Sequence, residues 1–215
     1  ALAELEHLVV QDIFFTETAG FADVILPASA FPEKTGTFTN TDRRVQLGRQ
    51  AINPPGEARQ DLWIIQALAR ELGLDWHYAH PRDVFNEMRL ASPSIAGITW
   101  ERLQTEHSVT YPCEVEGAPG QPILFQQGFP TQNGRGKFVP AHFSRAAELP
   151  DANYRLVFIT GRQLEHWHTG SMTRNASVLN AIEPEPVVCV SPANMRAIGL
   201  ESEGYVRVES RRGSI

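Results

Sequence analysis

The chain has 215 residues, of which 42% are hydrophobic, and its formal net charge is −6. This is enough for one large or two modest domains with apolar cores. The basic residues are scattered, which argues against a nucleic-acid surface, and no apolar run approaches the roughly 18–20 residues of a membrane-spanning helix. Cys113 and Cys189 form no CxxC pair, so we expect both to be structural and predict no cysteine-held cluster and no disulfide framework.

The first elements follow the order strand, helix, strand. Residues 7–13 have the pattern of a short buried strand that ends on Gln11 and Asp12. A short helical stretch at 16–21 and a second apolar strand at 23–28 follow. This order is typical of a doubly wound α/β layer, in which ligands bind beyond the carboxyl ends of the strands. Gln11, Asp12 and the loop after the second strand are therefore candidate binding positions.

Residues 31–46 are rich in threonine, glycine and charge and lack periodicity, which predicts a surface loop. A clear helix follows Asp61 and stops at Gly73. Its apolar stripe comprises Leu62, Ile65, Ala69 and Leu72. Weaker helical patterns cover 82–90 and 99–104.

The composition changes between residues 111 and 153, where proline, glycine and glutamine dominate and only short β-like pieces occur, at 123–125 and 137–139. This favours an irregular connection with a domain boundary near Pro150, and hence two domains, 1–150 and 151–215. The later part predicts strands at 154–160, 187–190 and 205–210, and a helix at 192–198. The last residues form a strand-like run without a closing element and residue 1 is not Met, so we expect a fragment.

The segment TGRQLEHWHTGSMTR, residues 160–174, contains the densest chemistry of the chain. Gly161 permits a close backbone approach, and Arg162 and Arg174 can each form a bidentate contact with a phosphate. With several hydroxyl groups and exposed backbone N–H groups, the segment suits a pyrophosphate. Two other interpretations are open: His166 and His168 are zinc ligands, or they only pack and form hydrogen bonds.

Four further side chains have two interpretations each. Asp61 is placed to cap the helix that follows it, or its carboxylate accepts hydrogen bonds from a guanine. Lys34 is a solvated lysine or a phosphate or ribose contact, and Asp12 starts a turn or binds a ribose or base edge. Arg43 and Arg44 are adjacent and point in different directions, so one of them pairs with Glu33 or Asp42.

Four segments taken together resemble one enzyme family. ADVILPASAFPEKTGTFTNTDRRVQ, EARQDLW, TGRQLEHWHTGSMTR and a terminal SRRG occur in the order found in the molybdenum or tungsten enzymes that carry bis-(molybdopterin guanine dinucleotide), abbreviated bis-MGD. That family includes formate dehydrogenases and periplasmic-type nitrate reductases. The resemblance implies an α/β fold: the end of a Rossmann-like α/β domain, followed by the start of a double-psi β-barrel domain that holds the pterin nucleotides.

The resemblance also implies the cofactor-binding residues. Gln11 and Asp12 are placed at a nucleotide, and Lys34 and Asp61 at the cofactor, with Asp61 at a guanine. The segment that wraps the pterin and pyrophosphate consists of Thr160, Gly161, Arg162, Gln163, Leu164, Glu165, His166, Trp167, His168 and Thr169. The metal-ligating residue and its catalytic neighbours lie upstream in the family, so no catalytic or metal-binding residue is assigned to this chain.

Residues 98–103, 109–113 and 128–143 resemble alpha subunits of NAD-linked formate dehydrogenases. This implies a molybdopterin-dependent oxidoreductase of the cytoplasm that oxidises formate to carbon dioxide. Its partners would be electron-transfer subunits with iron–sulfur clusters and flavin, and any iron–sulfur cluster of the subunit itself would lie upstream. A nitrate reductase of the same family and a non-catalytic cofactor-binding or assembly module are the alternatives.

Overall fold

The computed structural model describes residues 1–200 and 204–215 and divides into two compact units, Ala1–Lys137 and Phe138–Ile215. The fold mixes helices and strands, as the α/β prediction required. The predicted domain boundary near Pro150 stays a prediction. Among the described residues, no helix has the length and apolar character needed to cross a membrane.

The first unit begins with two short parallel strands. After a 3-10 turn at Leu2–Glu4, β1 spans Val9–Asp12 and β2 spans Val24–Pro27, with a 3-10 helix at Ala19–Phe21 between them. The predicted order strand, helix, strand is confirmed. The predicted burial is wrong, because Val9 is 47% and Val24 40% exposed. A sheet of two strands has few neighbours, so its apolar side chains keep contact with solvent.

Residues 31–46 are not the surface loop that their composition predicts. They contain a 3-10 helix at Phe31–Glu33, strand β3 at Gly36–Thr39 and the start of β4 at Arg44–Gly48. The two strands pair antiparallel, and β4 also pairs with β5, Ser108–Thr110. Threonine, phenylalanine and valine favour strands, and the pairing across the turn stabilises them despite the polar composition.

Three helices complete the first unit: α1 at Asp61–Glu71, α2 at Pro81–Ala91 and α3 at Trp100–Glu106, with a 3-10 turn at Pro93–Ile95. All three were predicted within a few residues. The stripe predicted for α1 is wrong in part, because Ile65 is 47% and Leu72 80% exposed, while Ile64, Gln66 and Ala69 are buried. The prediction assigned apolar residues to the buried face, whereas this face of the helix includes a glutamine, Gln66.

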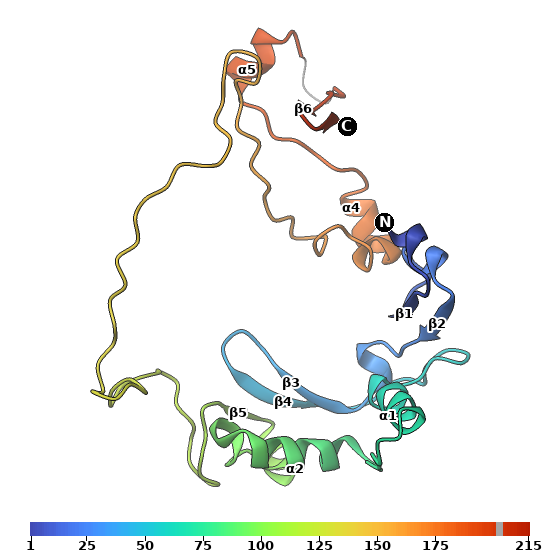
Figure 1. The fold of residues 1–215 in the computed structure, drawn as a ribbon, viewed down its shortest axis with the longest axis vertical. Helices are drawn as coiled ribbons and strands as arrows, with labels where there is room; N and C mark the ends of the chain where they lie inside the picture. The colour runs from blue at the N-terminus through green and yellow to red at the C-terminus, as the bar shows by residue number, and fades with distance from the viewer. Residues whose placement is uncertain (201–203) are drawn as a thin grey trace. The chain divides into compact units, whose positions relative to one another are not determined.

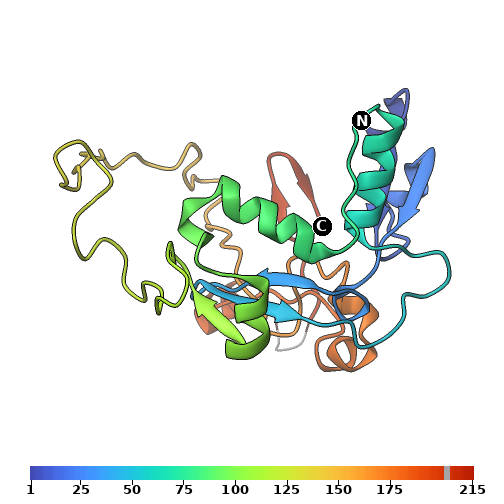
Figure 2. The same ribbon diagram turned by 90° about the horizontal axis from the view of Figure 1, so that it is seen from below.

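The core of the first unit lies between the β3–β4–β5 sheet and helices α2 and α3. Helix α2 runs along the β3–β4 hairpin in both ribbon views (Figure 1 and Figure 2). The buried cluster consists of Val45, Phe85, Ile98, Trp100, Leu103, Val109 and Cys113. The prediction that Cys113 is structural is confirmed, since its side chain is part of this core.

Within residues 111–172, all of which the structure describes, no helix or strand occurs. Residues 111–153 thus lack helices and strands, as their composition favoured, and the β-like pieces at 123–125 and 137–139 form no strands. The role of residues 111–153 as a connection between two domains stays a prediction. The predicted strand at 154–160 does not form either, and its apolar side chains are exposed. A strand needs a second strand as partner for its backbone groups, and the described part of the chain provides none for these residues.

The second unit contains a 3-10 helix at Thr173–Asn175, α4 at Ser177–Ile182, α5 at Pro192–Ala197 and a strand pair, β6 at Glu209–Ser210 with β7 at Gly213–Ser214. The helix predicted at 192–198 is confirmed. Residues 187–190 form no strand, Cys189 is exposed rather than structural, and only the end of 205–210 is paired. The Rossmann-like and double-psi descriptions stay predictions.

Candidate functional site

The candidate site lies at the carboxyl end of the β1–β2 sheet. Ala28, directly after β2, forms a parallel bridge with Arg59, and Ser29 N donates to Arg59 O over 2.9 Å. This pairing fixes the segment that leads into α1 beside the end of the sheet. The first residue of α1, Asp61, therefore lies where ligands of parallel sheets bind.

Asp61 connects two other segments of the first unit. Its Oδ1 accepts a hydrogen bond of 2.8 Å from Gln11 Nε2 on β1, and its Oδ2 accepts one from Lys34 Nζ. Lys34 directly follows the 3-10 helix at Phe31–Glu33, whose turn is held by a bond from Ala30 N to the Glu33 carboxylate. Three of the predicted cofactor-binding residues, which are far apart in the chain, thus meet at one carboxylate.

The capping prediction for Asp61 is wrong. Gln60 is the N-cap, with extended backbone angles of φ −63° and ψ 143°, and Asp61 is the first helical residue. Its carboxylate accepts hydrogen bonds from the side chains of Gln11 and Lys34. A negative charge in the first turn still favours the helix through its dipole.

The surroundings of Asp61 keep its carboxylate ionised. Partial burial by itself would raise the pKa of Asp61, but the hydrogen bonds from Lys34 and Gln11 and the charge of Lys34 outweigh that effect. The net result is a pKa below the ordinary value of 3.8. Asp61 is therefore a pure acceptor at neutral pH, and its two oxygens have lone pairs left for a further donor.

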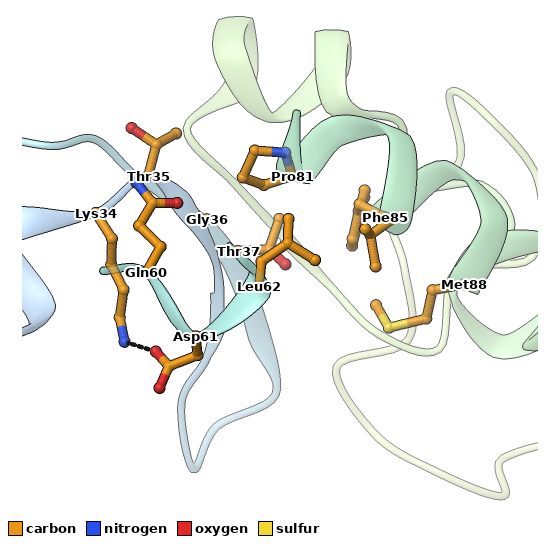
Figure 3. Close-up of a pocket in the computed structure, with 11 residues that line it drawn as sticks. Lys34, Thr35, Gly36, Thr37, Gln60, Asp61, Leu62, Pro81, Phe85 and Met88 are labelled. Atoms are coloured by element: carbon orange, nitrogen blue, oxygen red, sulfur yellow. Dashed lines mark hydrogen bonds and ion pairs between the residues drawn. The ribbon is translucent and has the colours of Figure 1, made fainter. Parts of the chain in front are cut away.

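A pocket of about 220 Å³ opens beside this cluster (Figure 3). Lys34 and Asp61 lie on one side of it, and Pro81, Phe85 and Met88 of α2 lie on the other (Figure 3). The remaining lining residues are Thr35, Gly36, Thr37, Gln60, Leu62 and Val84. Most of the wall is apolar, so the pocket suits a flat ring that offers hydrogen-bond donors at one edge.

Sequence reasoning missed the α2 wall of this pocket. The helix itself was predicted, but nothing in its residues indicates that it faces Asp61. That placement depends on the β3–β4 hairpin, which was predicted as a loop.

The other charged candidates of the first unit have local structural roles. Asp12 Oδ1 accepts a hydrogen bond of 3.1 Å from Phe14 N, so Asp12 starts a turn, one of its two interpretations. Arg44 pairs with Asp42 at 3.4 Å, as expected for one of the two adjacent arginines. Arg43, with a φ of 66°, points elsewhere and donates to the carbonyl oxygens of residues 111, 121 and 122.

In the second unit, most of the motif at 160–169 is exposed: Thr160, Gly161, Arg162, Leu164, Trp167, His168 and Thr169. Gln163 and Glu165 are partly buried. His166 is buried, its Nε2 lies 2.7 Å from Glu183 O, and its Nδ1 lies 3.2 Å from Thr173 Oγ1. His166 thus holds the motif against α4, which agrees with the packing interpretation of this histidine.

No group of three or more His, Cys, Asp or Glu side chains that could hold a metal ion occurs in the part of the chain that the structure describes. Two buried polar atoms have no hydrogen-bond partner there: Ser29 Oγ at the end of β2, and Gln163 Nε2 in the motif. A buried donor without a partner is costly, so Gln163 is suited to a ligand that supplies an acceptor. In the first unit, the acceptor capacity of Asp61 separately fits the donor edge of a nucleotide base.

Two family models match the chain. Residues 1–71 match the model described as molybdopterin oxidoreductase, and residues 156–215 match the molydopterin dinucleotide binding domain. The chain therefore carries a segment of the molybdopterin oxidoreductase domain, followed by a segment of the dinucleotide-binding domain.

Relatives named formate dehydrogenase match the whole chain. It is 47% identical to the F420-dependent formate dehydrogenase subunit alpha of Methanocaldococcus jannaschii, over 100% of this chain and 32% of the relative. It is 41% identical to the F420-dependent formate dehydrogenase 2 subunit alpha of Methanococcus maripaludis, again over 100% of this chain and 32% of the relative. The chain thus spans about a third of the length of these relatives.

Among solved structures, the acetylene hydratase of Pelobacter acetylenicus has a similar fold. The TM-score is 0.60 at 20% sequence identity, and the match covers 100% of this chain and 31% of that one. This likeness concerns the fold alone.

Proposed function

We propose that this chain is part of the catalytic subunit of a formate dehydrogenase and that it holds the bis-MGD cofactor of that subunit. The observation that carries the proposal is that Gln11 and Lys34 both donate to the carboxylate of Asp61, which lines a pocket together with Lys34. It is supported by the two family models and by relatives named formate dehydrogenase over the whole chain.

In the first unit, Asp61 would recognise a guanine. The base offers two parallel donors, its ring N1–H and its exocyclic amine, and a carboxylate offers two parallel acceptors. Gln11 fixes the orientation of the carboxylate, and Lys34 keeps it ionised. Asp12, next to Gln11, would contact the ribose or a base edge of the same nucleotide, and Lys34 its phosphate or ribose.

In the second unit, the motif from Thr160 to Thr169 would hold the pterin and the pyrophosphate. Arg162 supplies a guanidinium, the exposed backbone of the motif supplies N–H donors, and Gln163 supplies the unpartnered donor. In the complete subunit, strands formed by residues 154–160 and 205–210 would then belong to a double-psi barrel, and the first unit to a Rossmann-like domain.

When bound, the molybdenum or tungsten centre of the cofactor supplies the two-electron redox chemistry that converts formate to carbon dioxide. The residues of this chain would bind the nucleotide end of the cofactor and orient it. Iron–sulfur clusters and flavin in other parts of the enzyme would carry the electrons away, and the enzyme would act in the cytoplasm. NAD is the acceptor implied by the sequence resemblance, whereas the names of two relatives favour coenzyme F420.

The full-length subunit with its partner subunits tests this proposal. Formate-dependent reduction of an artificial dye is expected, and the same preparation should reduce either NAD or F420 when formate is the donor. Nitrate reduction without formate oxidation would overturn the assignment in favour of a nitrate reductase. A subunit that binds the cofactor but oxidises no formate with any acceptor would favour the assembly module.

A further inference from the structure

Gln66 is the buried polar residue of α1, and both polar atoms of its side chain form hydrogen bonds within the first unit. Its Oε1 accepts a hydrogen bond of 2.6 Å from Tyr78 N, and its Nε2 donates to Tyr78 O over 3.2 Å. The amide oxygen and the amide nitrogen thus bond to the backbone N–H and C=O of the same residue, in the way that a residue on a neighbouring strand does. Such a double contact fixes the position and the rotation of the peptide at Tyr78.

Tyr78 belongs to the short connection between α1 and α2. Gly73, with a φ of 81°, ends α1 in the left-handed region, and Leu74 N donates back to Ala69 O over 2.9 Å. After Tyr78 the chain enters α2 through His80, whose Nδ1 caps the helix by accepting from Arg82 N. The start of α2 is therefore set by the residue that Gln66 holds.

Helix α2 provides the wall of the pocket that faces Asp61. Pro81 in its first turn and Met88 near its end both line the pocket (Figure 3). Tyr78 also reaches α2 directly, because its hydroxyl donates to Glu87 over 2.6 Å. A loss of the contacts at Gln66 would release the connection. The packing of Phe85 in the core would still hold the middle of α2, while its first turn, with Pro81, would shift relative to the carboxylate.

We infer that Gln66 is a positioning residue for the nucleotide pocket: it holds Tyr78 so that the apolar wall of α2 lies at a fixed distance from Asp61. This inference rests on the proposed function, because it takes the ligand between wall and carboxylate to be guanine. Gln66 itself contacts no ligand. It sets the distance between the α2 wall and Asp61, whereas Asp61 recognises the edge of the base.

The two roles predict different patterns of binding. Inosine monophosphate (IMP) lacks the exocyclic amine of guanosine monophosphate (GMP), so IMP keeps the flat ring and loses one donor to Asp61. A wider pocket weakens the stacking of both bases on the α2 wall and so raises both Kd values by the same factor. A change at Asp61 removes the preference for GMP.

The test uses the full-length subunit produced without cofactor, with GMP and IMP as probes in a titration. Gln66→Met keeps the length and loses both hydrogen bonds, and it is expected to raise the Kd of both nucleotides by on the order of tenfold with an unchanged ratio. Gln104→Met, the same change at an exposed position of α3, is the control and should leave both Kd values unchanged.

Gln66→Glu is a milder variant that keeps the acceptor for Tyr78 N, and its Kd values should lie between those of the wild type and Gln66→Met. Unchanged Kd values in folded Gln66→Met, even with a lower melting temperature, would reduce Gln66 to a structural residue and overturn the inference. A loss of the preference for GMP would overturn it too. If the wild-type subunit binds neither nucleotide, the guanine assignment fails, and this role of Gln66 fails with it.

Discussion

Lys34 and Asp61, 27 residues apart in the chain, form an ion pair at the edge of a pocket whose opposite wall is a helix. Their side chains are 27% and 41% exposed, so the pair is accessible to a ligand while it is partly shielded from water. An exposed pair of this kind contributes little to folding. Its value lies in presenting an ionised, oriented carboxylate to a binding partner.

Asp61→Ala in the full-length subunit is expected to weaken cofactor retention by on the order of 1–3 kcal/mol, the cost of leaving the donors of a guanine unpaired. The amounts of metal and of GMP released by hydrolysis, each per polypeptide after gel filtration, measure it. Asp42→Ala removes another ion-paired aspartate, which pairs with Arg44, and should change neither amount. Unchanged cofactor content in Asp61→Ala, with reduced thermal stability, would make Asp61 only a helix-stabilising residue.

The lowered pKa of Asp61 predicts a dependence of stability on pH. The folded state binds this proton less readily than the unfolded chain, whose carboxyl titrates near 3.8. The stabilisation is therefore fully present above that value and is lost as the pH falls through the lower, folded-state pKa. The solvent exposure of the side chain keeps the effect small.

The melting temperature of the cofactor-free subunit, followed from about pH 6 to about pH 3, measures this effect. The difference between the wild type and Asp61→Asn should be constant near neutral pH and should shrink in the acid range. A difference that grows on acidification would contradict the predicted direction of the pKa shift.

The sequence predicted much of this site but not how its parts meet. Gln11, Lys34 and Asp61 were each named, two from the ends of expected elements and one from a motif. Their contacts depend on the Ala28–Arg59 bridge and on the β3–β4 hairpin, which are long-range pairings that local patterns do not encode. Composition even favoured a loop at 31–46, because threonine and glycine are frequent in loops as well as in polar strands.

In the second unit, the sequence predicts a strand where the structure has none. Residues 154–160 have strong strand formers, yet the described part of the chain gives them no partner strand. Intrinsic preference alone does not form a strand, since the backbone hydrogen bonds must be made with another segment. Helix 192–198 was predicted correctly because Ser191, Pro192 and Gly199 mark its ends locally.

Arg102 of α3 is expected to stabilise the first unit strongly. Its buried guanidinium donates to Gly97 O over 3.2 Å, to Ala118 O over 2.6 Å and to Glu106 over 2.8 Å. Arg102→Met should lower the free energy of unfolding by about 3 kcal/mol, because buried carbonyl oxygens lose their partners. Urea denaturation of the full-length subunit measures it, and Arg70→Met at an exposed site of α1 should be nearly neutral.

Ser29→Ala is expected to raise the free energy of unfolding, whereas Arg102→Met lowers it. The side chain is 1% exposed and its Oγ has no partner among the described residues. Removing the hydroxyl should raise the stability of the cofactor-free subunit by about 1 kcal/mol. Ser94→Ala is the matched comparison: Ser94 Oγ lies 3.2 Å from Ser92 Oγ, so this change should cost stability slightly. A fall in stability for Ser29→Ala would show that the hydroxyl has a partner in the complete subunit.

Gln163 offers the sharpest test of the motif in the second unit. Its Nε2 is buried without a partner in the described structure, which is unfavourable unless a ligand supplies an acceptor. Gln163→Leu should therefore leave the cofactor-free subunit as stable or more stable by about 1 kcal/mol, and should weaken cofactor retention by a similar amount. Melting curves with and without cofactor measure both effects.

Gln127→Leu is the control, because Gln127 is exposed and lies outside the motif. It should change neither the stability nor the retention of cofactor. If Gln163→Leu destabilised the cofactor-free subunit, Gln163 would have a protein partner in the complete chain, and its amide would not be reserved for a ligand. If it left cofactor retention unchanged, the motif would hold the pyrophosphate through Arg162 and the backbone N–H groups alone.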